Sequence, residues 1–255
     1  MHTHEAFTRE FRQGAPMVGA WQVVGHPVVA ELLADAGFDF VVVDGEHSEN
    51  TLSEIAASVR AIEAGDGAAP LVRVSSADRV EIRRVLDLGP AGVIVPQTES
   101  LAEAEEAVRA TRYPPAGVRG VAGRRSSGYG RDLTADVRGE DPTALTILQV
   151  ETAGALEDVE EIAALEGLDG LFVGPADLSA RLGAFGEFDA EEFREAVHRV
   201  VAAAREADLP VGTIAGTPDA VGRRWDWGVD FIVAGDDLSY VADGATAFRD
   251  RFDAL

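Results

Sequence analysis

The segment VVVDGEHSEN, residues 41 to 50, ends an apolar run with four residues that could take part in acid–base chemistry: Asp44, Glu46, His47 and Glu49. Histidine changes its charge near neutral pH, and a neighbouring carboxylate can orient its ring and raise its basicity. His47 is therefore a candidate general base that Asp44 and Glu46 could orient, or else a loop histidine that bonds only locally. Glu49 is predicted to be hydrated surface, and Glu46 either orients His47 or faces a neighbouring subunit.

Two carboxylates follow later apolar runs. Glu151 comes directly after LTILQV, where Thr152 could cap the next helix without it, and Asp177 lies in VGPADLSARLG. In a chain with 45 Asp and Glu, either carboxylate taken singly is more often surface or a helix N-cap. Together, two oxygen ligands with waters and a bidentate substrate suit an octahedral Mg²⁺ or Mn²⁺ site better than zinc, since the chain has no cysteine and no paired histidines.

Arg73 interrupts the apolar run PLVRV. A guanidinium there needs an anion, which is either one of the chain's acids or a carboxylate or developing oxyanion of a ligand. Gly174, Pro175 and Ala176 form a turn into a short helix, whose backbone N–H groups could receive a carboxylate. Trp21 either walls a pocket or fills the core, and filling is the simpler interpretation.

These residues follow apolar runs that read as buried parallel strands, with helical periods between them. The runs span residues 17 to 24, 38 to 44, 70 to 74, 91 to 96, 145 to 151, 169 to 175, 210 to 216 and 229 to 235. Eight such units in 255 residues, without a linker, predict one α/β domain, a (β/α)8 TIM-type barrel. In a barrel the strand ends meet at one mouth, so Gln149 joins the candidates above.

Only the stretch between the fourth and fifth strands departs from this spacing. It contains YPPAGVRGVAGRRSSGYGRD and runs over residues 113 to 143, longer than a connection requires. We expect a loop over the barrel mouth that has a function or contacts another subunit. The alternative is a surface insertion.

The composition excludes several classes of protein. The formal charge is -23, and all 22 basic residues are arginine, so Schiff-base catalysis by lysine, anchored pyridoxal phosphate and a P-loop are ruled out. Acid spread along the whole chain indicates a halophile and disfavours binding to nucleic acid or an anionic membrane. No apolar stretch could span a membrane and no signal peptide is evident, which predicts a cytoplasmic protein.

The runs VVVDGEHSEN, VRV, GVIVPQTES, ATRYPPAGVRGV and LQVETAGALEDVEEIAALEGLDGLFVGPADLSARLG resemble, in this order, the HpcH/HpaI aldolases. The resemblance covers nearly the whole chain, and RYPPAGVRG followed by QVET and GPADLS is its most specific part. These are class II, metal-dependent pyruvate aldolases, including the 4-hydroxy-2-oxoheptanedioate and 2-keto-3-deoxy sugar acid aldolases. The resemblance implies cleavage of a 4-hydroxy-2-oxo acid to pyruvate and an aldehyde. It also implies a hexamer in which the C-terminal helix is exchanged between subunits.

By this resemblance, Glu151 and Asp177 would hold a divalent metal, Mg²⁺ or Mn²⁺, with Co²⁺ as a further candidate. His47 would be the catalytic base with Asp44 assisting, and Arg73 would stabilise the enolate. The absence of lysine agrees, because a class I aldolase needs that amine.

The resemblance also implies roles for the residues that surround the metal and the base. Gln149 would line it, and the backbone from Gly174 to Ala176, which includes Pro175, would take the pyruvate carboxylate. Trp21 is a substrate-binding candidate from its position at a strand end, and not from the resemblance. The aldehyde partner would be chosen by parts that vary in the family: Gln97, Thr98, Ser100, Arg124, Arg125, Ser126 and the stretch near Thr213.

Two alternatives stay open. A lyase like the citrate lyase β-subunit would act on a CoA thioester and need cations for its phosphates, for which Arg124 and Arg125 are the candidates. A non-catalytic barrel would bind oxo acids without forming an enolate.

Overall fold

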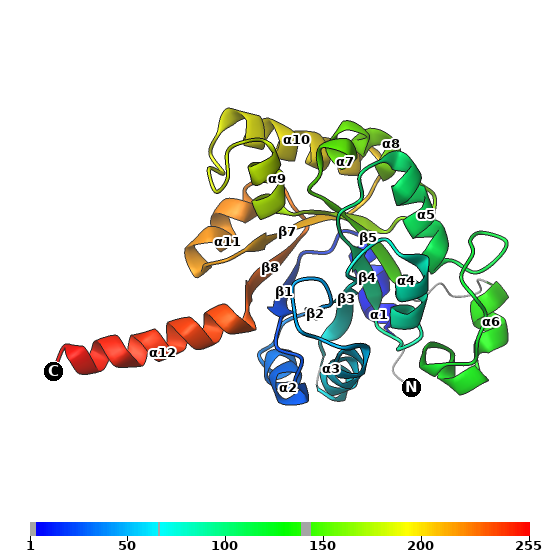
Figure 1. Cartoon of the computed structure of the whole chain (residues 1–255), viewed down its shortest axis with the longest axis horizontal. Coiled ribbons are helices and arrows are strands. Elements are labelled where there is room, and N and C mark those ends of the chain that lie inside the picture. Colours follow the sequence, from blue (N-terminus) through cyan, green and yellow to red (C-terminus); the bar gives the residue numbers. More distant parts are fainter. Residues whose placement is uncertain (1–3, 66, 139–143) are drawn as a thin grey trace.

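The described part of the chain, residues 4–65, 67–138 and 144–255 of a computed structural model, forms a closed parallel barrel of eight strands in sequence order (Figure 1). The strands are β1 (Met17–Gln22), β2 (Phe40–Asp44), β3 (Ala69–Arg73), β4 (Gly92–Val95), β5 (Leu145–Val150), β6 (Gly170–Val173), β7 (Val211–Ala215) and β8 (Phe231–Asp236). Each predicted run overlaps one of them, and β3 and β8 extend one residue beyond their runs, so the predicted TIM-type barrel is confirmed.

Helices surround this barrel. They are α1 (Glu5–Arg12), α2 (Pro27–Asp35), α3 (Leu52–Ala64), α4 (Arg79–Leu86), α5 (Leu101–Thr111), α6 (Leu133–Arg138), α7 (Ala153–Glu157), α8 (Val159–Ala163), α9 (Pro175–Arg181), α10 (Glu191–Glu206), α11 (Pro218–Trp225) and α12 (Asp237–Asp253). Several begin at polar caps, such as Thr51 in a capping box and Asp78, whose side chain accepts two backbone N–H groups. No described helix is long and apolar enough to cross a membrane.

The interior of the barrel is filled by phenylalanine. The Phe231 ring lies 6.0 Å from the rings of Phe40 and Phe172, and all three side chains are buried. Glycines on neighbouring strands make room for them, because a Cβ would lie 2.3 Å from the Phe40 ring at Gly19 and 2.2 Å from the Phe231 ring at Gly212. The barrel is therefore a packed core, and polar chemistry is confined to its ends.

A helix precedes the first strand. Residues 5 to 12 form α1, and Phe11 is buried against the barrel with its ring 4.9 Å from that of Phe231. His4 Nε2 lies 3.0 Å from Glu63 Oε1. His2 lies outside the described residues. Because α1 follows no strand, the alternating pattern gave no reason to expect it.

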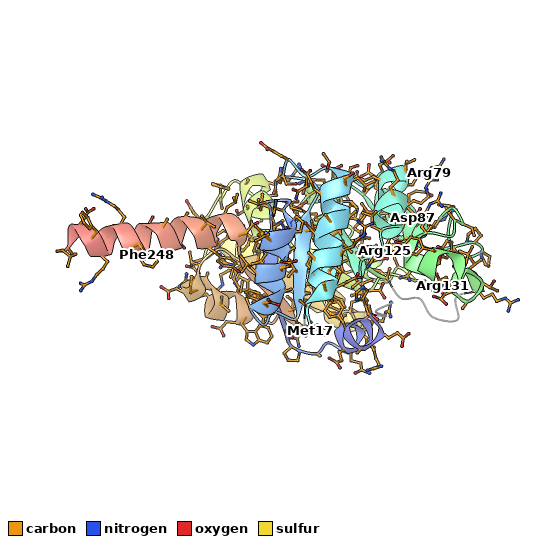
Figure 2. All side chains as sticks on the ribbon, turned by 90° about the horizontal axis from the view of Figure 1, so that it is seen from below. Met17, Arg79, Asp87, Arg125, Arg131 and Phe248 are labelled. Carbon is orange, nitrogen blue, oxygen red and sulfur yellow. The ribbon has the colours of Figure 1, made fainter. Side chains whose placement is uncertain are left out.

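The prediction that the loop at residues 113 to 143 covers the mouth is wrong for its described part. Arg125 donates to the Leu88 carbonyl at 3.0 Å and pairs with Glu63. Both partners stand at the C-terminal ends of helices, which in a βα barrel lie on the face opposite the mouth. In Figure 2, Arg79 at the start of α4, Asp87 at its C-cap and Arg125 follow one another, so Arg125 lies beyond the C-terminal end of that helix. The loop joins a helix to a strand, so barrel topology requires this face.

The C-terminal helix α12 projects away from the barrel (Figure 1), and Figure 2 shows Phe248 on the projecting part. Its apolar residues include Val241, Phe248 and Phe252, whose exposed fractions are 72%, 85% and 64%. An apolar helix surface of this kind is typical of a segment that packs on another chain. Exchange of α12 between subunits, and the hexamer, stay predictions.

Candidate active site

Asp44 and Arg73 form a buried ion pair at the mouth. They are the last residues of the adjacent strands β2 and β3 and are register partners. Arg73 donates from Nε to Asp44 Oδ1 at 2.9 Å and from Nη2 to Oδ2 at 2.8 Å. Burial alone raises the pKa of the Asp44 carboxyl, but the hydrogen bonds and charge of Arg73 outweigh it and hold that pKa below its usual range. The guanidinium is therefore fixed in position.

This pair corrects one expectation about Asp44. Its oxygens accept from Arg73 and from the backbone N–H groups of Glu46 and His47, at 2.9 Å and 3.4 Å for the two amides. Asp44 therefore orients Arg73 and the loop, and no described hydrogen bond joins it to the His47 ring. The carboxylate near that ring belongs to Glu46, with 3.9 Å between His47 Nε2 and Glu46 Oε1.

Glu46 lies between His47 and Arg73. Its Oε2 is 2.8 Å from Arg73 Nη1, without the geometry of a hydrogen bond. Burial raises the pKa of Glu46 against the opposing charges of Arg73 and His47. The His47 side chain itself is 69% exposed and faces open solvent. Within its own subunit, Glu46 thus contacts both His47 and Arg73.

Trp21 both fills the barrel and covers the ion pair. Its ring centroid is 6.0 Å from that of Phe172, and the Arg73 guanidinium carbon lies 4.7 Å from its centroid. The side chain is buried. A cation stacked on an aromatic face is stabilised by the ring quadrupole, which restricts Arg73 further.

Glu151 is a buried carboxylate beyond the end of β5. The backbone N–H of Gln97 donates to Glu151 Oε1 at 2.9 Å, and Gln149 Nε2 donates to Oε2. Gly174 permits this packing, because a Cβ there would lie 2.3 Å from Glu151 Oε2. Thr152 caps α7 by accepting from the Ala155 amide, so Glu151 is not needed as a cap.

Burial and neighbouring negative charges both disfavour the ionised form of Glu151. The pKa of Glu151 is raised to about 7, chiefly by burial and further by the charges of Asp177 and Glu46, while the Gln97 amide and Arg73 oppose the rise. Gln149 Oε1 is also buried without a partner. A buried group of oxygen atoms with excess negative charge is the environment that a hard divalent cation neutralises.

Asp177 is the second carboxylate at this edge. It stands in the first turn of α9, half-buried, but the N-cap is Gly174 and Asp177 makes no capping bond. The described residues contain no group of three or more metal-ligating side chains. Two carboxylates therefore fit a metal only if waters and substrate complete the coordination, as the sequence predicted.

The predicted carboxylate cradle at Gly174 to Ala176 is smaller than expected. The Gly174 amide donates to the Val150 carbonyl at 3.3 Å, and Pro175 has no amide hydrogen. Of these three residues, only Ala176 has an N–H that could face a ligand.

Two other histidines are not among the residues that contact Asp44, Arg73 or Glu151 in the described part of the chain. His26 Nδ1 accepts from the Val28 amide as the N-cap of α2, and His198 lies exposed on α10. Arg125 is held on the opposite face.

Arg181 was not among the residues selected from the sequence. The sequence pattern that could have identified it is the four-residue spacing from Asp177, which places the two residues on one face of α9.

The pKa of Glu151 gives a pH prediction. A carboxyl raised from 4.5 to about 7 holds its proton more tightly in the folded protein, so the metal-free protein should lose stability as pH rises through this range. The loss should be roughly 3 kcal/mol. Mg²⁺ should restore stability most above pH 7, because it replaces the proton.

The measurement is urea unfolding at fixed ionic strength from pH 5 to 8, with EDTA or Mg²⁺, for the wild type and Glu151→Gln. The difference in the free energy of unfolding between the two proteins isolates the contribution of the Glu151 carboxyl. A difference that is flat with pH, or that favours the wild type increasingly as pH rises in EDTA, would contradict the assignment.

Comparison with known proteins agrees with this geometry. The family model described as HpcH/HpaI aldolase/citrate lyase matches residues 18–243. The chain belongs to this family. As a member of the HpcH/HpaI family, it is 40% identical over 244 residues to a 4-hydroxy-2-oxovalerate aldolase of Novosphingobium aromaticivorans, covering 94% of this chain and 91% of that protein. A hydroxypyruvate/pyruvate aldolase of Delftia acidovorans is 36% identical, with coverages of 97% and 92%.

A solved HpcH/HpaI family structure from Burkholderia cenocepacia superposes with a TM-score of 0.92 at 34% identity. The match covers 98% of this chain and 99% of that one. The protein is thus an HpcH/HpaI pyruvate aldolase with the family's barrel. Its two aldolase relatives carry different substrate names, so identity at this level does not fix the substrate.

Proposed function

We propose that this HpcH/HpaI aldolase depends on a divalent metal and cleaves a 4-hydroxy-2-oxo acid to pyruvate and an aldehyde. The observation that carries the proposal is the placement of the buried Glu151 carboxylate close enough to Asp177 and Arg73 for the charges of these two residues to shift its pKa. A cation-binding edge and a fixed guanidinium thus meet at one mouth. This is the arrangement that formation of an enolate from a 2-oxo acid requires.

Glu151 and Asp177 are the proposed metal ligands, and Mg²⁺ or Mn²⁺ would supply Lewis acidity toward the bound oxo acid. Arg73 is the proposed donor to the developing enolate oxygen. Its Nε and one Nη2 hydrogen are used by Asp44, which leaves hydrogens on Nη1 and Nη2 for the substrate. Because Asp44 and Trp21 already hold the guanidinium, little reorganisation is needed during reaction.

His47 is the proposed base for the C4 hydroxyl. Its exposed ring stands at the open side of the mouth, where the aldehyde half would enter or leave. Glu46, near both His47 and Arg73, is placed to orient the His47 ring.

Replacing His47 by asparagine should lower turnover by about 10²-fold or more, because the proton acceptor is lost. Stability should hardly change, since the side chain is exposed. Steady-state cleavage rates and thermal unfolding test this, with His198→Asn on α10 as the matched control. Near-normal turnover would remove His47 from this role.

The direct test of function is release of pyruvate from 4-hydroxy-2-oxo acids, assayed in high salt with Mg²⁺ or Mn²⁺ and again after complete removal of metal by EDTA. We expect release with metal and its loss without metal. Full activity without metal would overturn the metal assignment.

The CoA-dependent alternative loses its candidate cations. Arg125 is engaged with Glu63 and Leu88, and Arg124 donates only to the adjacent Gly123 carbonyl in the described structure. Both belong to the loop on the face opposite the mouth. Calorimetry should therefore detect no CoA binding, whereas the oxo-acid sensor alternative is distinguished by proton exchange, as discussed below.

A further inference from the structure

A buried arginine near the end of α11 lacks an acidic partner among the described residues. Three arginines of the described chain are buried: Arg73, Arg119 and Arg224. Arg73 pairs with Asp44 at 2.8 Å, and Arg119 lies 3.3 Å from Asp87. Arg224 is 8% exposed, and its Nε atom is buried without a hydrogen-bond partner. Burying an unpaired cation is costly, so this guanidinium has an unmet need for an anion.

Aromatic rings hold the Arg224 guanidinium in place. Its central carbon lies 4.1 Å from the ring centroid of Phe188 and 4.3 Å from that of Trp227. Both rings pack on the buried Phe193, each with 5.4 Å between centroids. The rings stabilise the cation through its face, whereas its N–H groups lie in its own plane and stay available for hydrogen bonds.

Arg224 lines a pocket on the outside of the barrel. The pocket lies between α10 and α11, which follow one another around the barrel (Figure 1), and has a volume of about 1060 Å³. Small-molecule sites have volumes of roughly 300 to 1000 Å³, so the pocket is large enough for a metabolite. Beside His198, three arginines balance three acids in its lining: Arg194, Arg223, Arg224, Glu187, Asp189 and Asp226. The pocket is thus formally neutral in a chain of charge -23.

The electrostatics around Arg224 also favour a bound anion. Burial, and then the charge of Arg223, lower the pKa of the Arg224 guanidinium, and Asp189 opposes them only in part. Both effects disfavour the cation. A negatively charged ligand beside it would offset them.

A carboxylate fits this cation best. Elsewhere in the chain, Arg73 binds the Asp44 carboxylate through Nε and Nη2, and in Arg224 the Nε of this edge has no partner. A planar carboxylate can accept from both nitrogens of such an edge. A phosphate dianion would be repelled more strongly by the three acids of the pocket. The lining also includes Ala190, Val197 and Ala220, which offer apolar surface to a short carbon chain.

We infer that Arg224 anchors a second ligand site, which binds the carboxylate of a small organic acid through Nε and Nη2 and its carbon chain on the apolar part of the pocket. The described residues that line this pocket include none of Asp44, Arg73, Glu151 and Asp177. The site is therefore separate from the proposed metal site, and the inference does not depend on the proposed function.

The test is an NMR titration that follows the ligand signals of butanoate and of its uncharged isostere butanamide. The protein is the wild type, from which metal and then EDTA have been removed, at fixed ionic strength. It should bind butanoate more tightly than butanamide. Arg224→Gln should weaken butanoate binding by about 10- to 100-fold, because charged hydrogen bonds are lost. Arg199→Gln, at an exposed arginine of α10, is the matched control and should leave the affinity unchanged.

Tryptophan emission provides a second measurement that does not require removal of the buried arginine. Butanoate should change the emission of the wild type, because Trp227 lies against Arg224. In Trp227→Phe this change should disappear while butanoate still binds. If Arg224→Gln proves unfolded by its melting temperature, this pair of proteins decides the question.

Equal affinity for butanoate and butanamide would overturn the inference, as would wild-type affinity in a folded Arg224→Gln protein. An emission change that persists in Trp227→Phe would place the ligand elsewhere and overturn it too. If butanoate does not bind the wild type and Arg224→Gln alters the oligomeric state in light scattering, a second copy of the chain covers the pocket and the inference is wrong.

Discussion

Replacing Glu151 by glutamine should reduce turnover by about 10³-fold or more, because the buried carboxylate that would bind the metal becomes neutral. The fold should persist. Glutamine can still accept from the Gln97 amide, and rotation of the Gln149 amide would turn its unpartnered oxygen toward the new N–H₂ group. Turnover, Mg²⁺ affinity by calorimetry and thermal unfolding are the measurements.

The matched control is Glu105→Gln, the same change at an exposed position of α5. It should alter neither affinity nor turnover. A Glu151→Gln protein that binds Mg²⁺ as tightly as the wild type would contradict the metal assignment. Loss of activity through unfolding would be visible as a lowered melting temperature in EDTA.

Replacing Arg73 by alanine should affect stability and catalysis together. Asp44 is 1% exposed, and removing its partner leaves an uncompensated buried charge, at a cost of roughly 3 to 5 kcal/mol. Turnover should fall by about 10²- to 10³-fold, since a fixed donor to the enolate oxygen is lost. Urea unfolding and steady-state kinetics measure the two effects.

A second variant separates them. Asp44→Asn combined with Arg73→Ala removes the buried charge, so stability should recover in part while turnover stays low. Recovery of turnover along with stability would show that Arg73 serves only the fold. Arg112→Ala, at an ion pair on Asp169 away from the mouth, provides a comparison for loss of a structural pair.

Strand positions were predictable because each βα unit repeats the same local pattern, and the barrel follows from that repetition. The geometry then brings Asp44, Arg73 and Glu151 to one end from distant parts of the sequence. Their residue types and strand-end positions were enough to select them. Which carboxylate would hold Arg73 was not predictable, because the register of β2 against β3 decides it.

Other features depend on information that local patterns lack. The loop containing Arg125 looked functional from its composition, but its place is set by chain direction, since it leads from a helix into a strand. The α1 helix stands outside the repeat and is fixed by burial of Phe11. Arg181 contacts Gln97, which is 84 residues away in the sequence.

The central claim is that this barrel forms an enolate from pyruvate with the help of a metal. The most direct measurement is proton NMR of pyruvate in deuterated water with the enzyme and Mg²⁺, without aldehyde. We predict exchange of the methyl protons, reduced to background by EDTA and by Glu151→Gln. Pyruvate binding without exchange would identify a non-catalytic oxo-acid-binding barrel, and exchange that persists after complete metal removal would contradict the metal-dependent mechanism.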